Sequence, residues 1–127
     1  MATVAKVKTG LTKKILVVED EGEIALVLDM VLVDKKLQPD YVKTLLEADE
    51  YLAKEQPSLI ILDNQLPDGF GVDFISYAKK KYPSVKIIML TGFATAHDVA
   101  MANGADAFFE KPFSLDAFYE AVDRLLA

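Results

Sequence analysis

"SLIILDNQLPDGFG" (residues 58–71) joins an uninterrupted apolar run to an aspartate, Asp63, and then to a Pro-Asp-Gly turn with a second glycine. An aliphatic run without polar alternation is typical of a strand that is covered on both faces. Asp63 therefore stands at the end of a predicted buried strand. A carboxylate in that position can form a turn, bind a metal or act as a nucleophile, and the rest of the chain has to distinguish these roles.

The rest of the chain repeats this strand pattern between helical segments. Four further short runs are "KILVV" (14–18), a weaker "DYVK" (40–43), "VKIIML" (85–90) and "DAFF" (106–109). Apolar residues between the runs have the spacing of a helix face, prolines such as Pro39 mark the joints, and Ser114 is predicted to cap the last helix. The alternation predicts an α/β fold: a doubly wound (βα)5 sandwich, flavodoxin-like, with a five-stranded parallel sheet of order 2-1-3-4-5.

Length and composition predict one globular domain. The chain has 127 residues, a net charge of −6 and no cysteine. The charge argues against direct binding of nucleic acid, and the missing cysteines exclude disulfides and thiolate metal sites. Residues 1–13 lack the apolar core of a signal peptide, and no run of about 18 apolar residues exists to cross a membrane. We expect a mobile lead-in (1–13), a domain (14–127) and a cytoplasmic protein.

Reactive side chains follow four of the five predicted strands. Glu19 and Asp20 follow the first, Asp63 the third and Thr91 the fourth, and Lys111 comes just after the fifth. Because ligands in open parallel sheets bind at the carboxyl ends of the strands, we expect these side chains to meet on one rim. Three carboxylates that lie close together repel one another unless a cation lies between them, and a cluster of oxygen ligands suits Mg²⁺.

The same five residues form a complete site for phosphoryl transfer. A carboxylate such as Asp63 can attack phosphorus and become an aspartyl phosphate. The charge that develops on the phosphoryl oxygens would be compensated by Mg²⁺, the Lys111 ammonium and the Thr91 hydroxyl.

These motifs, taken together, resemble one family. The stretches that carry the resemblance are "VVEDE" (17–21), "LDNQLPDGFG" (62–71), "LTG" (90–92) and "GADAFFEKPF" (104–113). The chain resembles, from about Lys14 to its end, the response-regulator receiver domain, the CheY-like phospho-acceptor of two-component signalling. The resemblance implies a phosphoprotein rather than an enzyme. Such a protein promotes only its own phosphorylation and dephosphorylation. It also implies a histidine kinase or a histidine phosphotransfer protein as phosphate donor.

The resemblance also assigns the roles around the metal. It implies Asp63 as phospho-acceptor, Asp20 as a direct Mg²⁺ ligand, Glu19 as an assisting ligand and the backbone carbonyl of Gln65 as a further ligand. Asp63 itself belongs to the same metal set.

Further roles concern the phosphoryl group and the signal. The resemblance implies that Thr91 and Lys111 contact the phosphoryl group, that Phe108 occupies the aromatic switch position and that the Lys111–Pro112 peptide is cis. A downstream protein is expected to dock on the 92–127 face, and the domain is expected to be a monomer or a weak dimer.

One segment departs from the family pattern. The connection between Thr91 and Gly104 is about two residues shorter than in typical members. The helix in it is therefore expected to be short or irregular. His97, the one histidine of the chain, is interpreted as a surface residue at the start of this helix.

Two other functions are weighed against the receiver. An aspartyl-phosphate phosphohydrolase commonly carries an acid two residues after its nucleophile, where this chain has Gln65. A flavin-binding module of the same fold would need a Ser/Thr/Gly-rich phosphate loop after the first strand, where "EDEGE" stands instead. The chain stops after the last helix, so we expect either a single-domain regulator or one domain of a longer protein.

Overall fold

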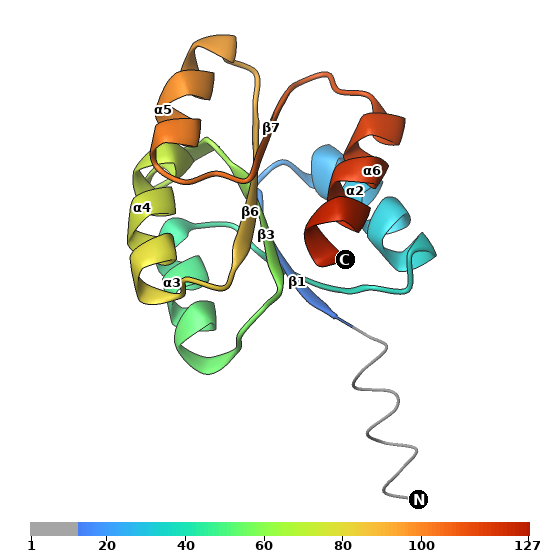
Figure 1. Cartoon of the computed structure of the whole chain (residues 1–127), viewed down its shortest axis with the longest axis horizontal. Coiled ribbons are helices and arrows are strands. Elements are labelled where there is room, and N and C mark those ends of the chain that lie inside the picture. Colours follow the sequence, from blue (N-terminus) through green and yellow to red (C-terminus); the bar gives the residue numbers. More distant parts are fainter. Residues whose placement is uncertain (1–12) are drawn as a thin grey trace, which may run out of the picture.

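The structure is a computed structural model in which residues 13–127 are described (Figure 1). The predicted lead-in, 1–13, thus lies outside the described residues except for Lys13. The strands are β1 (Lys14–Val18), β2 (Gln38–Val42), β3 (Leu59–Asp63), β4 (Gln65–Leu66), β5 (Gly69–Phe70), β6 (Lys86–Thr91) and β7 (Ala107–Glu110). The helices are α2 (Gly22–Asp34), α3 (Leu45–Lys54), α4 (Gly71–Lys81), the 3₁₀ turn η1 (Ala94–Ala96), α5 (His97–Ala102) and α6 (Leu115–Leu126).

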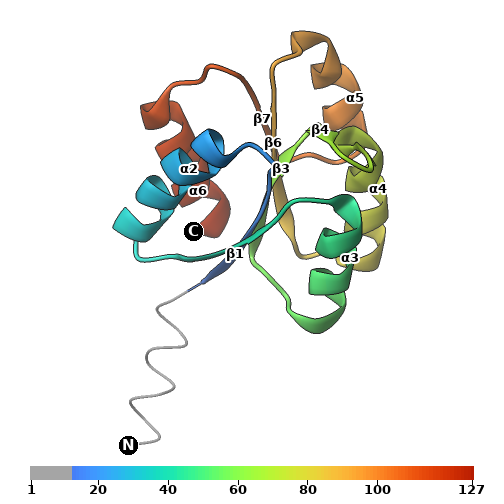
Figure 2. The same ribbon diagram turned by 180° about the vertical axis from the view of Figure 1, so that it is seen from behind.

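Five strands form one parallel sheet, and helices cover both of its faces. The strand order is β2-β1-β3-β6-β7. Helices α2 and α6 lie on one face, and α3, α4 and α5 lie on the other (Figures 1 and 2). Counted along the main sheet alone, this order is 2-1-3-4-5, so the predicted doubly wound fold is confirmed. None of the helices between residues 13 and 127 has the length and apolar character needed to cross a membrane.

The core has two apolar layers, because successive residues of a strand point to opposite faces of the sheet. Leu16, Ile60 and Ile87 point towards α3, α4 and α5, whereas Ile61 and Ile88 point towards α2 and α6. All five are at most 1% exposed. Burying such a side chain contributes about 1.5–3 kcal/mol, so the three central strands hold the rim of the sheet in place.

Strand β2 includes a proline that was predicted to mark a joint. Pro39 is the second residue of β2, and that prediction is wrong. The strand lies at the edge of the sheet, where proline is tolerated. Gln38 donates its backbone N–H to the Lys13 carbonyl at 3.0 Å, so Pro39, one residue further on, turns its nitrogen towards the open edge.

A small antiparallel hairpin follows β3, and the sequence did not predict it. Strands β4 and β5 pair Gln65 with Phe70 and enclose the turn residues Pro67 and Asp68. The Asp68 carboxylate accepts the backbone N–H groups of Leu45 (2.8 Å) and Leu46 (2.9 Å). The hairpin is thereby tied to the start of α3, where unpaired N–H groups favour an acidic side chain.

The connection between β6 and β7 is compact. It contains η1 and the six-residue helix α5, which confirms the expected short helix. At the start of α6, Ser114 accepts the Ala117 N–H at 3.2 Å and caps the helix as predicted. The Lys111–Pro112 peptide between β7 and α6 is cis.

Candidate functional site

The predicted site residues meet at the carboxyl ends of the central strands. Asp63 is the last residue of β3 and Thr91 is the last residue of β6. Glu19 and Asp20 follow β1 directly, and Lys111 follows β7. A hollow of about 460 Å³ opens at this rim, here called the acidic hollow. Its lining is Asp20, Glu21, Asp63, Gln65, Thr91, Gly92, Phe93 and Lys111.

Three carboxylates cluster at the acidic hollow: Asp20 and Asp63 line it, and Glu19 lies close to both. Oxygen atoms of Glu19, Asp20 and Asp63 all lie within 4.8 Å of one another. Glu19 and Asp63 are buried, at 4% and 5% exposure, whereas Asp20 is exposed. Buried carboxylates at this spacing favour a cation between them, and their hard oxygen ligands fit Mg²⁺. Gln65, whose backbone carbonyl was predicted as a further ligand, lines the same hollow.

Lys111 is the cation that the chain itself supplies. Its Nζ atom lies 3.2 Å from Asp63 Oδ1, 3.3 Å from Glu19 Oε2 and 3.7 Å from Glu21 Oε1. Partial burial lowers the pKa of Lys111, but the charges of Asp63 and Glu19 more than offset this effect, so the net shift of its pKa is upward. Lys111 therefore carries a positive charge next to Asp63 at neutral pH.

Glu19 has an unusual environment for a carboxylate. Burial, together with the charge of Asp63, raises the pKa of Glu19 to about 7. The backbone N–H of Glu21, which donates to Glu19 Oε1 at 3.1 Å, and the Lys111 ammonium oppose this shift. Without a metal ion, Glu19 thus holds a proton for part of the time at neutral pH.

The turn after β3 fixes the orientation of Asp63. The Asn64 backbone N–H donates to Asp63 Oδ1 at 2.8 Å and to the Leu90 carbonyl at 3.1 Å. Asn64 in turn accepts the N–H groups of Gly71 (2.7 Å) and, at Oδ1, of Val72 (3.1 Å). A Cβ atom on Gly71 would lie 2.3 Å from the Asp63 carbonyl oxygen, so only glycine allows this approach.

Thr91 lies almost wholly beneath the surface, at 1% exposure. Its Oγ1 accepts the Phe93 N–H at 3.1 Å, which leaves the hydroxyl proton available for another acceptor. The Lys111 N–H donates to the Thr91 carbonyl at 2.8 Å. The two residues predicted to contact a phosphoryl group are thus joined through their backbones.

Phe108 lies outside the acidic hollow. The half-buried ring packs against the core layer beneath α3, α4 and α5. It also meets the ring of His97, with the centroids 5.1 Å apart and the planes at 86°. His97 begins α5 and is exposed, as predicted, but no pattern in the sequence indicates that the two rings touch.

The sequence also missed three residues of the site: Glu21, Asn64 and Phe93. Each directly follows, or nearly follows, a predicted site residue at a strand end. A rule that included the two residues after each predicted site residue, Asp20, Asp63 and Thr91, would have found all three. Asn64 also had a second signal, because asparagine often bonds nearby backbone groups in turns.

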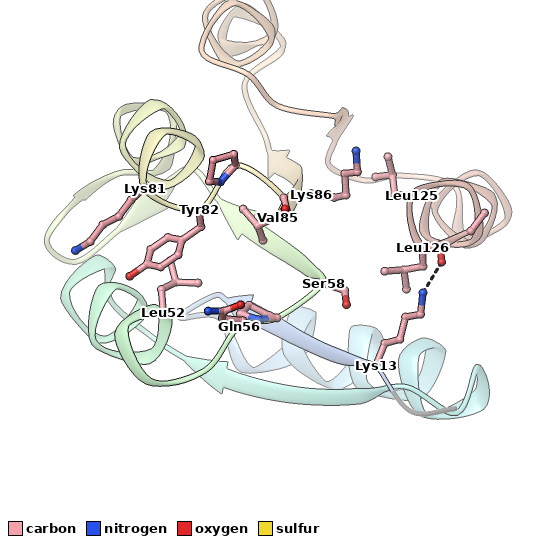
Figure 3. A pocket seen from close by; sticks show the side chains of 14 residues that line it. Lys13, Leu52, Gln56, Ser58, Lys81, Tyr82, Val85, Lys86, Leu125 and Leu126 are labelled. Carbon is pink, nitrogen blue, oxygen red and sulfur yellow. Dashed lines mark hydrogen bonds between the residues drawn. The ribbon is translucent and has the colours of Figure 1, made fainter. Parts of the chain in front are cut away.

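A second hollow, of about 430 Å³, lies at the opposite end of the sheet (Figure 3). Ser58, Val85 and Lys86, at the amino ends of β3 and β6, line it together with Leu125 and Leu126 of α6. No Asp or Glu side chain lines this hollow, and none of the predicted site residues belongs to it. Of these two hollows in the part of the chain that the structure describes, the acidic hollow is the one with the groups that phosphoryl transfer requires.

Comparison with known proteins places this geometry in a family context. The sequence pattern of the response regulator receiver domain matches residues 15–123. The chain is 33% identical to the response regulator protein PilR of Pseudomonas aeruginosa over 116 residues. This match covers 90% of this chain and 26% of PilR. It is 27% identical over 118 residues to sporulation initiation phosphotransferase F of Bacillus subtilis, which covers 91% of this chain and 95% of that protein.

A solved structure agrees with these sequence matches. The beryllofluoride-activated NtrC4 receiver domain dimer superposes with a TM-score of 0.83 at 35% identity, over 88% of this chain and 94% of that chain. The chain spans about a quarter of the length of PilR but nearly all of the sporulation protein.

Proposed function

The chain belongs to the response regulator receiver domain family, and from this membership we propose that Asp63 accepts a phosphoryl group within the domain formed by residues 14–127. Receiver domains of this family are in general signalling modules rather than enzymes. The observation that carries the proposal is the contact of Asp63 with Lys111 at 3.2 Å, inside a ring of carboxylates at the carboxyl ends of the strands. A lysine in this position can compensate the negative charge of a phosphoryl group that is transferred to Asp63.

The hydrogen bonds of Asp63 support a proposal about which of its oxygens reacts. Lys111 Nζ and the Asn64 N–H both donate to Oδ1. Oδ2 is therefore the oxygen that we expect to attack phosphorus, as the bond from phosphorus to the donor's histidine nitrogen breaks. The bonded Oδ1 meanwhile keeps the carboxylate oriented.

A metal ion fits the carboxylates of this site. We propose that Glu19, Asp20, Asp63 and the carbonyl of Gln65 hold Mg²⁺, which when bound supplies positive charge to the phosphoryl oxygens. Lys111 supplies a second positive charge, and Thr91 donates the hydroxyl proton that Phe93 leaves unused. The three contributions act on the same developing charge, as phosphoryl transfer requires.

The signal is proposed to leave through the β6–β7 side of the domain. Thr91 directly precedes residues 92–110, and Lys111 directly follows them. A phosphoryl group on Asp63 that attracts both side chains therefore shifts this segment. We propose Phe108 as the side chain that responds and the 92–127 face as the docking surface for a downstream protein. The phosphate donor is proposed to be a histidine kinase or a histidine phosphotransfer protein.

Incubation with Mg²⁺ and acetyl phosphate, followed by intact mass spectrometry, tests the acceptor. The wild-type chain should gain one phosphoryl group whose linkage is stable in acid and labile in base. Asp63→Asn should stay folded and gain none. Asp73→Asn, which changes an exposed aspartate at the start of α4, is the matched control and should react like the wild type. A phosphoryl group recovered at His97, or retained by Asp63→Asn, would refute the assignment.

A further inference from the structure

We propose that His97 holds the Phe108 ring in its present position and that phosphorylation of Asp63 has to break this contact. The contact is here called the ring latch. The inference rests on the proposed function, because a latch has a role only if the domain switches on phosphorylation. It goes further by naming the residue that sets how readily the switch occurs.

The geometry of the ring latch is that of a favourable aromatic pair. The two centroids lie 5.1 Å apart with the planes at 86°, an edge-to-face arrangement. His97 Nδ1 also lies 3.0 Å from Oδ1 of the exposed Asp98 side chain, the next residue of α5. Among residues 13–127, Asp98 is the only residue whose carboxylate lies within 4 Å of an imidazole nitrogen of His97. His97 therefore contacts a neighbour in α5 and the Phe108 ring of β7.

The ring latch connects the two arms that lead out of the acidic hollow. Phe108 lies three residues before Lys111 on β7, and His97 lies six residues after Thr91. The two arms are also joined at the rim, where the Lys111 N–H donates to the Thr91 carbonyl. Residues 91–97 and 108–111 thus form a closed loop of contacts, with Asp63 at one end and the latch at the other. We expect a shift of Thr91 towards Asp63 to move the connected residues 92–97 and so to displace His97 from Phe108.

The strength of the latch sets the expected effect. An edge-to-face pair contributes an amount that corresponds to about a 2- to 10-fold change in an equilibrium constant. If the latch is present only in the unphosphorylated state, its removal favours the other state by this factor. By thermodynamic reciprocity, a phosphoryl mimic that binds at Asp63 weakens the latch by the same factor.

The first experiment asks whether the two rings touch in solution. The chain has one histidine, so its imidazole protons give one set of NMR signals. Phe108→Leu should shift these signals, because the ring current of Phe108 is lost. Phe109→Leu is the matched control, since Phe109 packs on Phe113 and Phe118 instead. Unchanged His97 signals in Phe108→Leu would overturn the proposal.

The second experiment measures coupling to the site with beryllofluoride and Mg²⁺ as the phosphoryl mimic. His97→Ala should bind the mimic about 2- to 10-fold more tightly than the wild type. Val99→Ala, at an exposed position of α5, should bind like the wild type. In a Phe108→Ala background, His97→Ala should have no further effect.

The outcomes separate the latch from the proposed function. Equal affinities of the wild type and His97→Ala, or an effect that persists without Phe108, would remove the latch alone. If the wild type neither binds the mimic nor gains mass with acetyl phosphate, the proposed function fails and the latch fails with it.

Discussion

Glu19 is a residue whose charge depends strongly on its neighbours. It lies beneath the acidic hollow, next to Asp63 and Lys111, and its pKa of about 7 means that burial and Asp63 outweigh the lysine. A metal ion that takes up the charge of Asp63 favours the ionised form of Glu19. Metal binding is therefore linked to proton release near neutral pH.

This linkage predicts how stability varies with pH in metal-free buffer. Between pH 4.5 and about 7 the folded chain keeps the Glu19 proton that the unfolded chain has lost. Since the folded state binds more protons, the free energy of unfolding falls as the pH rises through this window. We expect a contribution of about 1–3 kcal/mol, fully present below pH 4.5 and lost above about 7.

Urea denaturation of the wild type and Glu19→Gln across this pH range measures that contribution. The difference between the two proteins should grow as the pH rises, in favour of the variant. Glu120→Gln, an exposed glutamate of α6, serves as the control and should follow the wild type. Parallel curves for the wild type and Glu19→Gln would contradict the prediction.

Asp20 gives the second prediction at this scale. It is the exposed member of the carboxylate cluster, so its removal should weaken Mg²⁺ binding while the fold stays intact. Mg²⁺ at ten times its dissociation constant should stabilise the wild type by about 1.4 kcal/mol. Asp20→Ala should lose most of this gain in a thermal melt and should phosphorylate more slowly. Its melting temperature without metal should rise slightly, because a like charge has been removed.

A control with the same change in charge separates local from global effects. Glu120→Ala removes one negative charge far from the site and should keep the full Mg²⁺ response. If Asp20→Ala responds to Mg²⁺ as strongly as the wild type, the ion binds elsewhere.

At the scale of elements, the start of α4 determines where Asp63 lies. The helix begins at Gly71, whose Cα faces the Asp63 carbonyl with no room for a Cβ atom. Gly71→Ala should therefore shift the end of β3 or α4 and destabilise the domain by about 1–3 kcal/mol. The phosphorylation rate with acetyl phosphate should fall further than this loss of stability explains, because the shift occurs at the acceptor.

The chain offers a matched glycine for this test. Gly22 begins α2, and a Cβ atom there would have no neighbour within 4 Å. Gly22→Ala should keep or slightly raise stability and leave phosphorylation unchanged. Equal behaviour of the two alanine variants would mean that the close approach at Gly71 does not constrain Asp63.

Among the strands, those in the centre of the sheet could be predicted from the sequence more closely than β2 or the β4–β5 hairpin. Strands β1, β3 and β6 were predicted within one residue because burial on both faces leaves a continuous aliphatic run. β2 was displaced because an edge strand, half exposed, tolerates Pro39 and polar residues. The β4–β5 hairpin was missed because two-residue strands have no periodicity of their own, and its hold on α3 through Asp68 joins segments far apart in the chain.

At the scale of the whole molecule, the meeting of the site residues was predictable and the ring latch was not. Parallel strands bring their carboxyl ends to one edge whatever their side chains are, so topology alone gathers Glu19, Asp63 and Lys111. The contact of His97 with Phe108 depends on the path of the 92–106 connection. No local pattern encodes that path, because its short helix and 3₁₀ turn are set by packing on the sheet.

Amide hydrogen exchange tests whether the whole β6–β7 side responds. Beryllofluoride with Mg²⁺ should change the protection of residues 92–110 and of the adjoining face of α6. The reason is that Thr91 and Lys111 transmit any shift into this segment, while β1 and β3 are held in the core. Asp63→Asn should show no change under the same conditions. Changes confined to 19–22 and 63–71 would mean that the site binds the mimic without a wider switch.

The proline of β2 has a consequence for the behaviour of the protein at high concentration. An open sheet edge can recruit a strand from another molecule and so begin a fibril. At this edge Pro39 points a nitrogen without hydrogen towards the open side, next to the exposed Asp40, so an incoming strand finds a missing donor and a charge. The residue that misled the sequence interpretation thus protects the sheet against growth by strand addition.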